Sequence, residues 1–276
     1  QVEGKDVGHV VFGHVVNTEP KDMYLSRVAA INGGCAEGTP AFNVNRLCGS
    51  GLQAIVSASQ SILLGDADVA IGGGAENMSR APFASLNMRW GARMGDTKMV
   101  DMMIGALHDP FHTIHMGVTA ENIAAKWGIS REQQDALAVE SHRRAQKATE
   151  AGYFKDQIVP VMLKSKKGDV AYATDEHFRP NATMDDMAKL KPVFAKENGT
   201  VTAGNASGIN DAAAAVVLME AKTAQARGLK PLARLVAYAH AGVDPKYMGI
   251  GPVPATQLAL KKAGLTVNDL DVIEAN

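Results

Sequence analysis

The sequence has only two cysteines, Cys35 and Cys48, among 276 residues. Two thiols in a chain of this length cannot make a disulfide framework, which excludes the small secreted domains that depend on several disulfides. Such a composition fits a reducing compartment, where thiols stay available for chemistry. We therefore expect a cytoplasmic protein, and we interpret Cys35 as a structural residue.

Long apolar runs and an excess of one charge are also missing. Even the apolar stretch at residues 212–219 is far shorter than the run of about 20 residues that crosses a membrane, so no membrane span is expected. The net charge is −1, from 28 basic and 29 acidic side chains, which argues against a nucleic-acid partner held by overall charge. An anionic ligand would need a local basic cluster.

An initiator methionine is absent too. The chain begins at Gln1 and stops at Asn276, directly after the strand-like residues 271–273. Both ends look cut, so we expect a piece of a longer protein, with any targeting peptide lying before Gln1.

What is present is the composition of a globular protein of one or two domains, with 46% hydrophobic residues to form a core. Short apolar strands alternate with helices up to about residue 79, which indicates parallel α/β units. The strands are expected at residues 7–11, 42–47 and 69–71, and the helices at 22–33 and 52–64.

The texture changes between residues 80 and 208, which we interpret as an insertion. After an irregular, methionine-rich part, a helix is expected to follow Ser130, with Gln133 completing a capping box and Gly152 ending the helix. An α/β texture returns at residues 211–219 and 231–239. A helix near residues 255–263 and a final strand are expected after that.

Cys48 lies where an extended segment runs into a helix, in the stretch NRLCGSGL. Apolar residues recur at helical spacing from Leu52 until Gly65 provides a stop. At a helix N-terminus, unpaired N–H groups and the helix dipole favour the thiolate and are suited to hold an oxyanion. Gly49 and Gly51 would let a reacting carbonyl approach the backbone. The pattern predicts a nucleophile, although a free cysteine is more often simply a small buried hydrophobic residue.

Five motifs carry a resemblance to a known family. They are NRLCGSGLQAI at residues 45–55, GGGAENMS at 72–79, HMGVTAEN at 115–122, TAGNASGIND at 202–211 and VIEAN at 272–276. In order and spacing they resemble the motifs of the thiolases, the acyl-CoA:acetyl-CoA C-acyltransferases. The resemblance covers essentially the whole chain and is closest to the bacterial biosynthetic β-ketothiolases that feed polyhydroxyalkanoate synthesis.

The resemblance implies an α/β thiolase fold in αβαβα layers, with an inserted loop domain and most of the second half absent. The expected divisions are an N-terminal thiolase domain at residues 1–79 and 209–230, a CoA-binding loop domain at 80–208, and the start of a C-terminal thiolase domain at 231–276. A homodimer or homotetramer is expected.

Catalytic roles follow from the same resemblance. Cys48 matches the cysteine that carries the acyl group, and its own backbone N–H matches one donor of an oxyanion hole. Asn276 matches an asparagine that orients a water in the second oxyanion hole. The family's catalytic histidine, in a G-H-P motif, and its second cysteine, in a C-x-G motif, have no counterpart among these residues.

Substrate contacts are also implied. The resemblance places His115 and Met116 at the pantetheine and acyl end, Ser207 on the pantetheine amides and Arg179 near the adenosine phosphate. The remaining members of this set are expected to line or enclose CoA: Leu107, His142, Leu190, Phe194, Ala203 and Ala206. Without the resemblance, the apolar members would be interpreted as core, the glycine- and alanine-rich run as a tight turn, and most basic side chains as a solvated face.

Two other site types were weighed. His108, His112 and His115 have spacings that converge on a metal when they lie on one helix, but Pro110 interrupts a helix there. The glycines at residues 72–74 lack the Lys-Ser/Thr of a phosphate-binding loop, so a packing role is expected. Neither a metal nor a tightly bound cofactor is expected.

The expected function is an acyltransferase that interconverts 3-ketoacyl-CoA plus CoA with acyl-CoA plus acetyl-CoA through an acyl-cysteine. CoA and acyl-CoA are then substrates and products. The alternatives are a truncated, inactive acyl-CoA-binding relative, a non-condensing or sterol-carrier-type relative, and a cysteine hydrolase.

Overall fold

The computed structural model describes residues 2–276, which divide into two compact units. Unit 1 comprises Gln1–His108, Ile209–Gly242 and Pro252–Asn276, and unit 2 comprises Asp109–Gly208 and Val243–Gly251. Among residues 2–276, no helix combines the length and the apolar character that a membrane crossing requires.

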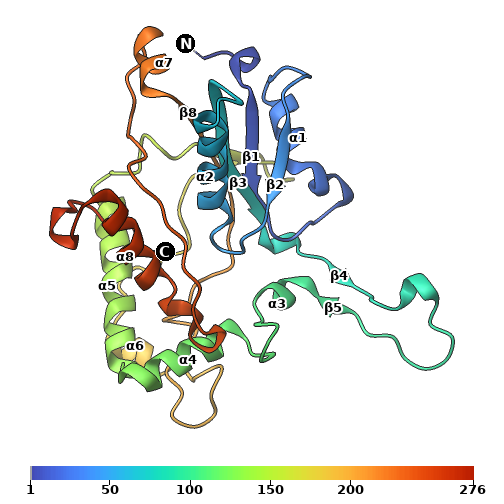
Figure 1. Ribbon diagram of the computed structural model, residues 1–276. Coiled ribbons are helices and arrows are strands. Elements are labelled where there is room, and N and C mark those ends of the chain that lie inside the picture. Colours follow the sequence, from blue (N-terminus) through green and yellow to red (C-terminus); the bar gives the residue numbers. More distant parts are fainter. Residues whose placement is uncertain (1) are drawn as a thin grey trace. The chain divides into compact units, whose positions relative to one another are not determined.

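Unit 1 is built on a four-stranded sheet (Figure 1). Its strands are β1 (His9–Gly13), β2 (Ala41–Val44), β3 (Val69–Asn77) and β8 (Asp211–Met219), in the order β2-β1-β3-β8. β1 runs parallel to both β2 and β3, whereas β8 runs antiparallel to β3. The expected parallel α/β units are therefore confirmed, with an antiparallel strand at one edge.

Helices α1 (Leu25–Asn32) and α2 (Ser50–Leu63) cover opposite faces of this sheet. Val10 packs in one buried cluster with Ala30 of α1, and Val11 packs in another with Ala54 of α2. Because successive side chains of a strand point to opposite faces, the two clusters form separate layers. The sheet thus lies between two layers of helix.

The rest of unit 1 consists of short elements. They are η1 (Gly4–Asp6), η2 (Pro20–Tyr24), η3 (Met78–Arg80), β4 (Phe83–Ala84), η4 (Met88–Trp90), β5 (Val100–Asp101), α3 (Met102–Ala106), α7 (Ala221–Ala226), α8 (Pro252–Ala263) and η6 (Val267–Asp269). The helix expected near residues 255–263 is confirmed as α8.

Two expectations in unit 1 need correction. Residues 231–239 and 271–273 are irregular rather than α/β elements, and Leu232 and Val272 are 105% and 87% exposed. A strand is stable only when its backbone groups pair with a neighbour. Within residues 2–276, neither segment belongs to a strand of any sheet.

Unit 2 is mainly helical. It contains α4 (Met116–Trp127), α5 (Arg131–Glu150), β6 (Val161–Leu163), β7 (Val170–Tyr172), α6 (Met184–Ala188) and η5 (Pro245–Ile250). The predicted capping box is confirmed, because Ser130 and Gln133 bond to each other's backbone N–H at the start of α5. Gly152 takes a left-handed φ of 77° just after α5 ends, as expected for a helix stop.

Candidate active site

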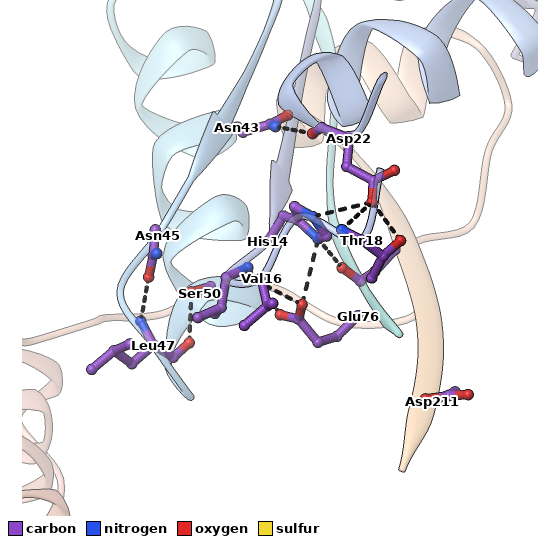
Figure 2. Close-up of polar contacts among 12 residues, drawn as sticks. His14, Val16, Thr18, Asp22, Asn43, Asn45, Leu47, Ser50, Glu76 and Asp211 are labelled. Atoms are coloured by element: carbon purple, nitrogen blue, oxygen red, sulfur yellow. Dashed lines mark hydrogen bonds and ion pairs between the residues drawn. The ribbon is translucent and has the colours of Figure 1, made fainter. Parts of the chain in front are cut away.

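Cys48 lies in a tightly held turn between β2 and α2 (Figure 2 shows the contacts on either side of it). Ser50 Oγ accepts the Arg46 N–H at 2.8 Å and donates to the Leu47 carbonyl at 2.6 Å. Asn45 Oδ1 accepts the Leu47 N–H at 2.9 Å. Leu47 itself has a φ of 47°, in a left-handed region that disfavours a branched side chain. The turn thus holds a strained backbone beside Cys48.

Glycines let the start of α2 approach the sheet. A Cβ on Gly13 would lie 2.5 Å from the Ser50 carbonyl carbon, and one on Gly72 would lie 2.7 Å from Ile55 Cα. Real Cβ atoms do not come so close to backbone. The packing role expected for the glycines at residues 72–74 is therefore confirmed. Gly13 has the same role, which the sequence did not indicate.

The two thiols have different surroundings. Cys48 is exposed just before α2, where the first N–H groups of a helix lack intrahelical acceptors. Cys35 is half-buried against the Val7, Val10, Ala30 and Val69 cluster, and burial raises the pKa of its thiol. A raised pKa favours the unreactive thiol form. Cys35 therefore has the setting of a structural residue.

A cavity of about 640 Å³ lies next to Cys48 within unit 1. Glycines and alanines of β3 and β8 form much of its wall, together with Met78 and Met103. Leu107, just after α3, and Asn276 also line it, so three of the predicted site residues meet at one cavity. Its apolar wall suits an acyl chain.

A partly buried polar network supports one side of the cavity (Figure 2). The Glu76 carboxylate accepts the N–H groups of Val15 and Val16 at 2.9 and 3.0 Å, and these three residues line the cavity. The ring of His14 is buried, with Nδ1 2.8 Å from the Ala75 carbonyl oxygen and 3.6 Å from Glu76 Oε1.

Asp22 lies on the other side of that ring, with Oδ2 4.0 Å from His14 Nε2. Burial works to raise the pKa of Asp22, but bonds from Thr18 and Glu19 and the nearby His14 hold it below its usual value. His14 and Glu76 were missed in the sequence. Their position at the ends of β1 and β3 was the available signal, because ligands of parallel sheets bind at the carboxyl ends of the strands.

The other predicted residues lie in unit 2. His115 caps α4, its Nδ1 accepting the Gly117 N–H at 3.0 Å, which places the proton of a neutral ring on Nε2. Its ring stacks on Phe194 with centroids 4.7 Å apart, and Met116 is the first residue of α4. His115, Met116 and Phe194 thus gather at the start of one helix.

His142 and Arg179 form a second group in unit 2. The Arg179 N–H donates to His142 Nδ1 at 3.2 Å, and within residues 2–276 no carboxylate forms an ion pair with Arg179. Arg143 and Arg144 differ, because both bond to Glu140 and lower its pKa to about 2. Arg179 is therefore better placed than these two to meet a phosphate.

The third group is the segment that contains Ala203, Ala206 and Ser207. These three residues are exposed, while Thr202, just before them, is fully buried. A Cβ on Gly204 would lie 2.6 Å from Cδ1 of Leu190, so this backbone packs directly on another predicted site residue.

The three histidines weighed as metal ligands do not form a metal centre. No group of three or more His, Cys, Asp and Glu side chains within residues 2–276 is arranged to hold a metal ion. His108 Nδ1 lies 2.7 Å from the Ile104 carbonyl oxygen, and His112 bonds through its N–H to Asp109.

Comparison with known proteins gives a consistent result. Residues 1–222 match the family described as thiolase, N-terminal domain, and residues 229–276 match thiolase, C-terminal domain. The chain is 74% identical over its whole length to the beta-ketothiolase BktB of Cupriavidus necator, of which it covers 70%. It is 50% identical over its whole length to the acetyl-CoA acetyltransferase of Syntrophomonas wolfei, of which it covers 69%.

The fold agrees with solved structures. A crystal structure of human mitochondrial 3-ketoacyl-CoA thiolase in complex with CoA superimposes with a TM-score of 0.91 at 43% identity, covering 98% of this chain and 68% of that one. The α/β thiolase fold expected from the motifs is confirmed. The chain therefore belongs to the thiolase family, whose general reaction is Claisen condensation and its reverse, thiolysis.

Proposed function

We propose that Cys48 carries the acyl group in the thiolase reaction of this protein. The observation that carries the proposal is the exposed thiol at the start of α2, beside an apolar cavity of about 640 Å³. In thiolysis, the Cys48 thiolate attacks the keto carbon of a 3-ketoacyl-CoA, and the bond between that carbon and C2 breaks. The electron pair of this bond stays on C2, which takes up a proton so that acetyl-CoA leaves. CoA then takes the acyl group from sulfur, and condensation is the reverse.

The negative oxygen that forms at the attacked carbon needs donors. The Cys48 backbone N–H, beside the start of α2, is our candidate for one, and Asn276 is our candidate for orienting a water towards a second oxygen. The position of Asn276 in the wall of the same cavity supports this assignment.

The CoA part of the substrate is assigned to unit 2. Ser207, with Ala203 and Ala206, is proposed to contact pantetheine, and His115, Met116, Leu190 and Phe194 to enclose it. Arg179, supported by His142, is proposed to face the adenosine phosphate. The name of the human relative solved with CoA supports a CoA ligand, and CoA would act as substrate and product rather than as a resident cofactor.

The setting of the protein is a further part of the proposal. We place it in the cytoplasm as a homodimer or homotetramer, acting in polyhydroxyalkanoate synthesis like the bacterial β-ketothiolases. The 74% identity to a bacterial beta-ketothiolase supports this placement. An inactive acyl-CoA-binding relative is not favoured, because the identity to named enzymes extends over the whole chain.

The test is to trap the acyl-enzyme. The full-length protein that contains this chain is incubated with acetoacetyl-CoA or acetyl-CoA without free CoA, and its intact mass is measured. We expect one added acetyl group that maps to Cys48, together with ping-pong kinetics in thiolysis. An unmodified mass with intersecting double-reciprocal lines would contradict the covalent role of Cys48.

A further inference from the structure

A buried ion pair marks the first turn of α5 in unit 2. Arg131 Nε donates to Asp135 Oδ2 at 2.7 Å, and the two side chains are only 20% and 4% exposed. A buried carboxylate is costly unless both of its oxygens have partners. Asp135 meets this requirement, because its other oxygen, Oδ1, accepts a bond from Asn205 Nδ2 at 2.9 Å.

Asn205 connects this ion pair to the backbone of residues 200–205. Its Nδ2 also donates to the Thr200 carbonyl at 2.9 Å, and its Oδ1 accepts the Thr202 N–H at 2.8 Å. One side chain thus bonds to Asp135 and to two backbone groups that flank the buried Val201. Because an amide side chain has a fixed planar geometry, these bonds set the path of the segment.

Glu121 of α4 provides a second anchor for the same segment. Its carboxylate accepts the N–H groups of Thr200 and Val201 at 2.9 Å and the Thr200 hydroxyl at 2.7 Å. Two helices therefore hold residues 200–205, and the chain beyond them reaches the exposed Ala206 and Ser207. The anchored part of the segment includes the buried Val201 and Thr202, and the part that follows it, Ala206 and Ser207, is exposed.

Arg131 extends the cluster to another site residue. Its Nη2 donates to the carbonyl oxygens of Met187 at 2.6 Å and Leu190 at 3.1 Å. The ion pair thus joins the segment that carries Ser207 to the position of Leu190, although neither Arg131 nor Asp135 is among the proposed CoA contacts.

We propose that Asp135 and Asn205 are positioning residues that hold residues 200–207 in the conformation that receives the pantetheine part of CoA. This inference rests on the proposed contact of Ser207 with CoA. Hydrogen bonds between neutral groups are directional and individually weak. A segment ordered before binding avoids the entropy loss that would otherwise oppose them.

The experiment uses a charge swap. In Asp135→Asn, the new amide can turn its NH2 group towards Asn205 or towards Arg131, and in either case two donors face each other. In Asn205→Asp, two carboxylates face each other. The double variant Asp135→Asn/Asn205→Asp restores a donor and an acceptor between these two side chains, while the Thr200 carbonyl loses the donor that Asn205 provides. The exposed Asp156, changed to Asn, is the matched control. CoA affinity, KM, kcat and the labelling rate of Cys48 by iodoacetamide are measured for each full-length protein.

Each single variant is expected to raise the Kd for CoA and the KM for acetoacetyl-CoA by about tenfold, and the double variant is expected to recover part of this loss, with both constants about threefold lower than in the single variants. The KM for acetoacetyl-pantetheine should rise by the same factor as the KM for acetoacetyl-CoA. The labelling rate of Cys48, kcat and the Asp156→Asn control should change little.

Unchanged CoA affinity in folded single variants, or a double variant no better than the singles, would overturn the inference. If Asp135→Asn does not fold, Asn205→Asp and Asn205→Ser decide alone by the same criterion. Failure of the parent protein to bind CoA would instead contradict the proposed function, so the two failures are distinguishable.

Discussion

The two units of this chain position their site residues by different means. In unit 1, glycines at residues 13 and 72 bring the sheet and the start of α2 into close backbone contact, directly after the turn that carries Cys48. In unit 2, charged and amide side chains such as Asp135 and Asn205 hold a segment in place. A close backbone contact is destabilised by an added methyl group. A polar network accommodates a change in side-chain volume more readily but is destabilised by a change in charge.

The largest expected effect concerns the nucleophile of unit 1. Cys48→Ser keeps the volume but weakens the nucleophile, so thiolysis should fall by about a thousandfold or more. CoA affinity should stay within a few-fold if CoA binds through unit 2. Cys35→Ser is the matched control and should retain turnover. Comparable loss in the two variants, or preferential iodoacetamide labelling of Cys35, would contradict the assignment.

The next largest expected effect comes from adding a methyl group at a glycine, and it should differ between the two units. Gly72→Ala puts a methyl group 2.7 Å from backbone of α2, and overpacking of this kind costs about 1–3 kcal/mol of unfolding free energy. Gly204→Ala in unit 2 meets the ends of the Met187 and Leu190 side chains, which can move. Urea denaturation should show the larger loss for Gly72→Ala, with Gly38→Ala, which adds a methyl group in open space, as the reference. Equal losses for residues 72 and 204 would remove the contrast.

Low pH tests the partly buried polar network beside the cavity. The pKa of Asp22 is lower in the folded protein than its ordinary 3.8, so its contribution is complete above that value and disappears as the pH falls through the folded pKa. Asp22→Asn should lower the unfolding free energy at pH 7 by about 1.5 kcal/mol and reduce the difference between pH 7 and pH 3.

The comparison for Asp22 lies on α6 of unit 2. Asp186→Asn removes an exposed carboxylate whose pKa Thr183 and Lys189 lower, and water replaces such contacts easily. Unfolding curves at both pH values should show the smaller change for this variant. A larger one would mean that the Asp22 bonds contribute little.

The smallest expected effect is a change in the salt dependence of CoA binding, which distinguishes neutral from charged contacts within unit 2. Ser207→Ala should remove the proposed neutral hydrogen bond to pantetheine, worth about 1 kcal/mol, and salt should hardly change this loss. Arg179→Ala should weaken CoA binding and also flatten its dependence on ionic strength. Titration of CoA at two salt concentrations checks both, and equal slopes would contradict the separate roles.

Local signals in the sequence were enough for several of these features. The capping box at Ser130 and Gln133 and the strand-turn-helix around Cys48 depend on residues close together in the chain, and both are confirmed. The residues that meet at the cavity, such as Leu107 and Asn276, came from the family resemblance, and their roles stay predictions.

Features that depend on distant partners were missed. Glu76 bonds to Val15 and Val16, which lie 61 and 60 positions away, and nothing local in either segment indicates that contact. The strand expected at residues 271–273 was wrong for the same reason, because apolar β-branched residues form a strand only beside a partner. The left-handed backbone of Leu47 had no signal, since leucine rarely adopts it.

The pairing of β3 with β8 has a consequence for how the molecule is assembled. Ser79 and Asp211, 132 positions apart, are joined by a hydrogen bond where the two strands meet, and the register continues to Val69 and Met219. During synthesis β1, β2 and β3 leave the ribosome long before β8, so the edge of β3 that pairs with β8 stays unpaired until β8 has been made. Contacts this distant slow folding, and an open edge is prone to pair with another molecule. Yield during expression should therefore depend on how quickly β8 arrives.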